Sequence, residues 1–133
     1  MNSNYCLPGL ALLIFLGWAC RPNAVSTAES LTPAQAADWL KQNPQGQLID
    51  VRTPEEYAPE HIKGAKLIPV QELESRLPEI KKDKPVLLYC HSGRRSTQAF
   101  QLLKDKGFTN LFQIAGGITA WKEQGQPVEK SAK

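Results

Sequence analysis

The sequence predicts an α/β fold in which a small parallel sheet carries helices on both faces. Short, continuously apolar runs, of which Pro85 to Tyr89 is the clearest, are typical of strands buried on both sides. Segments with apolar residues at helical spacing alternate with these runs along the chain. A chain of 133 residues has room for one such domain, since domains commonly hold about 100–150 residues.

The first expected element is a helix that begins after Thr32. Thr32 provides an N-cap, Pro33 suits the first helical position, and Gln35 completes a capping box. The helix should end by Asn43-Pro44, because Pro disfavours helical geometry in the residue before it. Gln47 to Val51 then forms a short apolar run, which predicts a buried strand.

The middle of the chain repeats this pattern in shorter pieces. Thr53 to Glu56 is a second helix-start signature. Leu67 to Val70 is expected to form a second short strand. Leu73, Leu77 and Ile80 recur at helical spacing, which predicts another helix before the chain turns at the following lysines.

The second half contains the strand that matters most for function. Pro85 to Tyr89 is followed by a helix on which Ala99, Leu102 and Leu103 share a face and which stops at Gly107. The last strand is expected at Leu111–Ile114, and the last helix runs from Gly116-Gly117 through Trp121 to Gly125. Open α/β sheets bind ligands beyond the carboxyl ends of their strands. The residues directly after Tyr89 are therefore expected at the binding edge.

Composition and charge exclude two classes of protein. The chain is 41% hydrophobic, which is enough to build a core and argues against disorder. The net charge of +3 is small, and Lys and Arg are interspersed with Asp and Glu, so nucleic-acid binding is not expected. A local anion site is compatible with both observations.

The N-terminus is typical of an exported protein. Residues 1–19 contain no charged side chain. Leu7 to Ala19 is an apolar stretch, interrupted only by Pro8 and Gly9, that is too short for a transmembrane helix of about 20 residues. We expect a signal peptide over 1–19, with an uncleaved anchor as the alternative, and a tether over 20–30. Leu16 to Cys20 resembles the lipobox of bacterial lipoproteins, which makes Cys20 the candidate lipidation site. The domain would span 31–128, a tail 129–133, and the location would be the periplasm or cell envelope.

Cys90 is the candidate nucleophile. Cys6 and Cys20 lie in or beside the signal, so Cys90 is the one cysteine of the folded body. It sits between a buried strand and a helix start, where free N–H groups and the helix dipole favour a thiolate. Gly93 lets the loop curl around an anion, and Arg94 and Arg95 add positive charge. The alternative is a buried cysteine used only for packing.

These residues belong to a pattern that resembles the rhodanese family. The family's active-site loop often reads Cys-x-x-Gly-x-Arg, which Cys90, Gly93 and Arg95 match. The resemblance extends over roughly Leu31 to Val128. Its other matching segments are Asp50-Val51-Arg52 with Glu56 and Tyr57, His61 to Ala65, and Gly116 to Trp121.

The resemblance implies a sulfurtransferase that works by double displacement. Cys90 would take the outer sulfur of thiosulfate or a similar small anionic donor, and the persulfide would pass it to a thiol or cyanide-like acceptor. Arg95, Arg94, His91, Ser92 and Gly93 are the candidate substrate-binding residues. No cofactor or metal is implied, and we expect a monomer, tethered to a membrane if Cys20 is lipidated.

Several residues keep simpler interpretations. His91 is expected to contribute its backbone more than acid–base chemistry. Asp50 and Arg52 are expected to organise local structure. His61 has no partners at metal-ligand spacing, and Trp121 is expected in the core.

Two other functions compete with sulfur transfer. A phosphatase or arsenate reductase of the related fold would need Cys-x5-Arg, but Ser96 occupies that position. A non-catalytic persulfide carrier or binding module remains open.

Overall fold

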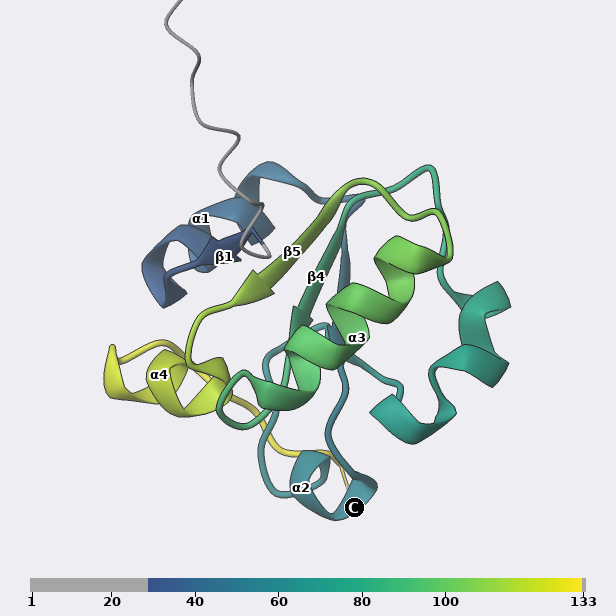
Figure 1. The fold of residues 1–133 in the computed structure, drawn as a ribbon. Coiled ribbons are helices and arrows are strands. Elements are labelled where there is room, and N and C mark those ends of the chain that lie inside the picture. Colours follow the sequence, from purple (N-terminus) through teal and green to yellow (C-terminus); the bar gives the residue numbers. More distant parts are fainter. Residues whose placement is uncertain (1–28, 133) are drawn as a thin grey trace, which may run out of the picture.

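The computed structural model describes residues 29–132, and a parallel five-stranded sheet lies at its centre (Figure 1). The strand order is β1-β5-β4-β2-β3. The strands are β1 (Ser30–Leu31), β2 (Gln47–Asp50), β3 (Lys66–Leu67), β4 (Val86–Tyr89) and β5 (Leu111–Ile114). The helices are α1 (Pro33–Gln42), α2 (Pro54–Tyr57), α3 (Arg94–Asp105) and α4 (Gly117–Glu123), with 3-10 segments η1 (Val70–Glu72) and η2 (Glu74–Glu79). The predicted α/β class is confirmed.

The central strand β4 separates two hydrophobic clusters. Helix α3 covers one face of the sheet (Figure 1). Val86 and Leu88 pack in the same cluster as Leu103 of α3. Leu87 and Tyr89 point to the other side, where they pack with side chains of α1 and α4. Since successive side chains of a strand alternate between faces, Cys90 continues the series of Val86 and Leu88 and belongs to the α3 side.

Both expected capping boxes form. The Thr32 hydroxyl accepts from the Gln35 amide, and the Gln35 side chain accepts from the Thr32 amide. Thr53 and Glu56 make the same reciprocal pair at the start of α2. These local signals are reliable because both partners lie within one helical turn.

Two of the predicted elements in the middle of the chain are wrong. The strand expected over Leu67 to Val70 is shorter, since β3 ends at Leu67 and Val70 already begins η1. Pro69 has no N–H for the sheet ladder. The helix expected around Leu73 and Leu77 is 3-10 instead, because Pro78 lies inside η2 and cannot donate an α-helical hydrogen bond.

Backbone pairing is found on both sides of residues 31–128, the segment expected to form the domain. Ser30, assigned to the tether, pairs with Gln113 of β5. Glu129, assigned to the tail, forms an antiparallel bridge with His61, and the Ser131 amide donates to the Ala58 carbonyl over 3.0 Å. A two-residue strand has no periodicity that a sequence could reveal.

The predictions for the signal peptide and Cys20 lie outside the described residues. Within residues 29–132, no helix has the length and apolar character needed to cross a bilayer.

Candidate active site

Cys90 directly follows β4, at the carboxyl edge of the sheet. Its side chain is only 1% exposed and lies at the base of an open depression of about 390 Å³. The other lining residues are His91, Ser92, Arg94, Arg95 and Gln98. The site is therefore open to small solutes, while its sulfur is shielded from bulky ones.

The loop after Cys90 aims a backbone donor at the sulfur. The Gly93 amide donates to Cys90 Sγ over 3.0 Å. Gly93 has φ +108°, which a residue with a side chain rarely adopts, so glycine is needed for this turn. Since α3 begins at Arg94, the positive end of its dipole also lies beside the sulfur. Both features stabilise negative charge on Sγ.

The start of α4 holds the loop from the other side. The amides of Ile118 and Thr119 donate to the carbonyls of Cys90 and His91, over 2.9 and 3.2 Å. Because a trans peptide is planar, the amides that follow those carbonyls point away from α4. Gly117 makes this close approach feasible: a Cβ there would lie 2.4 Å from the Cys90 carbonyl oxygen. Gly117 thus allows the start of α4 to hold the loop.

Ser96 is a site residue that the sequence analysis missed. It is fully buried, and the Cys90 thiol donates to its Oγ across 3.7 Å. Its hydroxyl can donate to the Gly93 carbonyl at 3.0 Å or to Gln113 Oε1 at 2.9 Å. Ser96 shares the buried face of α3 with apolar residues, and a hydroxyl at such a position was the available signal.

Arg95 is engaged by a carboxylate from a distant part of the chain. Its Nη1 and Nη2 donate to the two oxygens of Glu56 in α2, over 2.7 and 2.8 Å. The hydrogen bonds from Arg95 are the main cause that lowers the pKa of Glu56 to about 2, against an opposing effect of burial. A carboxyl with a lowered pKa stays ionised above that value, so the pair is intact at neutral pH and is lost only in strong acid.

The other predicted contacts surround the same depression. Arg94 and His91 are both exposed, and no described residue forms an ion pair with Arg94. The His91 ring has one side-chain partner, with Nε2 3.5 Å from Thr119 Oγ1. Ser92 also lines the depression. The structure therefore brings every predicted binding residue to Cys90 and adds Glu56, Ser96 and Gln98.

Asp50 and Arg52 form a buried ion pair at the carboxyl end of β2. Their closest atoms, Asp50 Oδ2 and Arg52 Nη2, are 2.6 Å apart. Arg52 also donates to the Glu60 carbonyl over 2.8 Å. Burial works against the charge of Arg52, but the hydrogen bonds and charge of Asp50 outweigh it and raise the pKa of Arg52. Since neither side chain lines the depression, the pair organises local structure.

His61 makes contacts that hold parts of the domain together. Its ring stacks on Tyr57 with centroids 3.9 Å apart, and Nδ1 lies 3.0 Å from the Tyr57 carbonyl. Its Nε2 lies 3.4 Å from Glu129 Oε1. These contacts tie the C-terminal segment to the domain.

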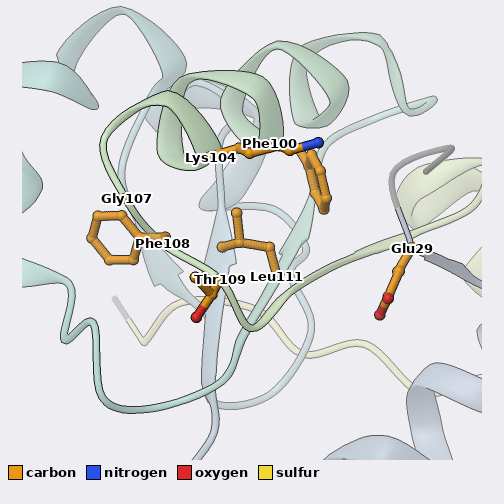
Figure 2. Close-up of a pocket in the computed structure, with 7 residues that line it drawn as sticks. All are labelled: Glu29, Phe100, Lys104, Gly107, Phe108, Thr109 and Leu111. Carbon is orange, nitrogen blue, oxygen red and sulfur yellow. The ribbon is translucent and has the colours of Figure 1, made fainter. Parts of the chain in front are cut away.

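A second concavity lies away from Cys90. Figure 2 shows its lining, which includes the apolar side chains of Phe100, Phe108 and Leu111, with Glu29 set apart from them. Phe108 and Leu111 precede or begin β5, so this concavity lies toward the amino ends of the parallel strands. Its lining contains no nucleophilic thiol or hydroxyl beyond Thr109.

The fold and the cysteine loop together define a member of the rhodanese-like class. The family profile for the rhodanese-like domain matches residues 32–124, so the chain belongs to this family. The structure of a rhodanese-related protein from Thermoplasma volcanium is similar, with a TM-score of 0.71 and 30% identity. That similarity covers 77% of this chain and 99% of the other.

Named relatives place the family in sulfur chemistry. The chain is 31% identical to "Thiosulfate sulfurtransferase GlpE" of Vibrio cholerae over 72% of its own length and 91% of the relative. It is 40% identical to "Probable adenylyltransferase/sulfurtransferase MoeZ" of Mycobacterium tuberculosis over 74% of its own length. The match spans only 26% of that relative.

Proposed function

We propose that this protein transfers sulfane sulfur through a persulfide on Cys90, with thiosulfate or a similar small anion as donor. The observation that carries this proposal is the Gly93 amide, 3.0 Å from Cys90 Sγ at the start of α3. An amide aimed at the sulfur stabilises both the attacking thiolate and the persulfide anion that replaces it. The sulfurtransferase names of two relatives support the same chemistry.

The reaction would proceed in two displacements. In the first, the Cys90 thiolate attacks the outer sulfur of thiosulfate, an Sγ–S bond forms, and sulfite leaves with the electron pair of the broken S–S bond. In the second, a thiol or cyanide-like acceptor takes the outer sulfur, and the electron pair returns to Sγ. Arg94 and Arg95 would attract the anionic donor to the depression.

Phosphoryl transfer fits this loop less well. A Cys-x5-Arg loop requires an arginine where Ser96 stands, and Ser96 is fully buried against Gln113 and the Cys90 sulfur. A non-catalytic carrier would form the same Cys90 persulfide as a sulfurtransferase, but it would not show steady-state turnover of donor and acceptor.

Mass spectrometry of the intact protein tests the proposal. After treatment with thiosulfate, we expect the intact mass to rise by about 32 Da, the mass of one sulfur atom, and peptide mapping to place the adduct on the peptide that contains Cys90. Cyanide should remove it as thiocyanate. Sustained turnover would identify an enzyme, whereas one equivalent of thiocyanate per protein would identify a carrier. No adduct from any sulfane donor would contradict the proposed function.

We also propose that the chain is exported and attached to a membrane through Cys20, because an uncharged apolar segment precedes that cysteine. A single acyl chain binds membranes only weakly, so stable attachment would need the several chains of bacterial lipoproteins. The full-length protein should fractionate with the cell envelope. A variant that lacks residues 1–19 and carries Cys20→Ala should be soluble and active. Full-length protein in the cytoplasm with residues 1–19 attached would refute export.

A further inference from the structure

We propose that Glu56 sets the charge of the sulfur donor that Cys90 accepts: by compensating Arg95, it disfavours dianionic donors relative to monoanionic donors of the same shape. This inference rests on the proposed function of Cys90. It assigns a specificity-determining role to a carboxylate 39 residues from Arg95 in the chain.

The geometry of the pair supports this role. Both Glu56 oxygens accept from Arg95, so the guanidinium and the carboxylate face each other in a bidentate arrangement. The side chains of Arg95 and Glu56 are 27% and 33% exposed, so the pair is partly open to solvent and does not belong to the core. Arg95 also lines the depression above Cys90. A donor anion at Cys90 therefore meets a cation that already has a partner.

Glu56 is also held in place by its own helix. The Thr53 amide and hydroxyl donate to Glu56 Oε2, over 3.0 and 3.2 Å. The carboxylate cannot move aside for an incoming anion without losing these capping-box contacts. It consequently remains near the donor throughout the reaction, as a fixed negative charge.

The charges of the site lead to the expected selectivity. Arg94 is the lining cation that no described residue pairs with, while Arg95 and Glu56 compensate each other. Arg94, Arg95 and Glu56 sum to one positive charge, and the Cys90 thiolate brings the total to zero. A dianionic donor therefore places one more uncompensated negative charge beside Glu56 and the thiolate than a monoanionic donor does.

Two sulfur donors of almost the same shape but different charge allow dianionic and monoanionic donors to be compared. Thiosulfate is a dianion, and methanethiosulfonate replaces one of its charged oxygens by a methyl group and is a monoanion. With either donor, Sγ forms a bond to the outer sulfur and the S–S bond of the donor breaks. The electron pair leaves with sulfite or with methanesulfinate, so both reactions give the same Cys90 persulfide.

The test compares kcat/KM for the two donors in Glu56→Gln. A glutamine whose oxygen takes the place of Glu56 Oε2 keeps the capping box and the hydrogen bond from Arg95 Nη1, but it removes the charge and also the hydrogen bond from Arg95 Nη2. We expect the ratio of thiosulfate to methanethiosulfonate kcat/KM to rise about three- to tenfold over wild type, as expected for one nearby partly screened charge. Glu55→Gln is the matched control, because it removes the same charge from an exposed neighbour in α2.

A double-mutant cycle tests whether the charge of Glu56 acts on the donor. In an Arg95→Ala background Glu56 has no compensating partner, so Glu56→Gln should raise the ratio at least as much as in the wild-type background, and the absence of a rise there would contradict the charge argument. An unchanged ratio in Glu56→Gln, an equal loss with both donors, or an equal rise in Glu55→Gln would overturn the assignment to Glu56 and leave the Cys90 chemistry standing. A wild-type protein that forms no persulfide from either donor would overturn both.

Discussion

Cys90→Ser should abolish sulfur transfer and leave the protein folded. Serine is nearly isosteric, and its hydroxyl can accept from the Gly93 amide in the position of Sγ. A hydroxyl cannot form a persulfide, so no adduct and no thiocyanate should appear. The exchange should cost about 1 kcal/mol of stability, since it places a hydroxyl at a site with hydrogen-bond partners. Thiosulfate-dependent transfer and thermal melting, measured together, check both parts.

The control is wild-type protein prepared in the same way, with circular dichroism to compare the folds. Activity near the wild-type rate in a folded Cys90→Ser variant would remove Cys90 from the mechanism. Loss of both fold and activity would show that the buried thiol also has a packing role larger than its contacts indicate.

Asp50→Asn should destabilise the protein by about 3–5 kcal/mol, because it leaves the buried Arg52 charge without its counter-ion. Both side chains are almost fully buried, and Arg52 makes its bidentate contact to Asp50 from within the domain. An asparagine has the same shape but no charge. Urea unfolding at neutral pH, with the midpoint and slope compared with those of wild type, measures the loss.

Asp38→Asn is the matched control, since Asp38 is exposed on α1 and loses the same charge. Its free energy of unfolding should stay within about 0.5 kcal/mol of wild type. A small effect of Asp50→Asn would mean that water or another group compensates Arg52, and the structural role assigned to the pair would then be wrong.

Local features of the chain could be predicted from the sequence. The two capping boxes, the strand after Pro85 and the helix start after Gly93 all depend on residues within a few positions of one another. Their geometry follows from backbone hydrogen bonding and side-chain preference in one turn or one strand. Cys90 was found in the same way, since its strand, its glycine and its arginines are contiguous. Two predictions were wrong, the length of the strand that precedes Pro69 and the α-helix that would contain Pro78. In both segments the apolar pattern is correct, but proline cannot donate the backbone hydrogen bond that the expected element needs.

The contacts that tune the site follow from tertiary structure alone. Glu56 was identified as the end of a capping box, and nothing near it in the chain points to Arg95. Ser96 meets Gln113 only because α3 packs on β5, and Gly117 meets the Cys90 carbonyl only because α4 begins beside β4. Strands that are parallel bring their carboxyl ends to one edge, whatever the length of chain between them. Which side chains meet at that edge depends on how the helices and strands pack in three dimensions. Their separation along the sequence does not reveal these contacts.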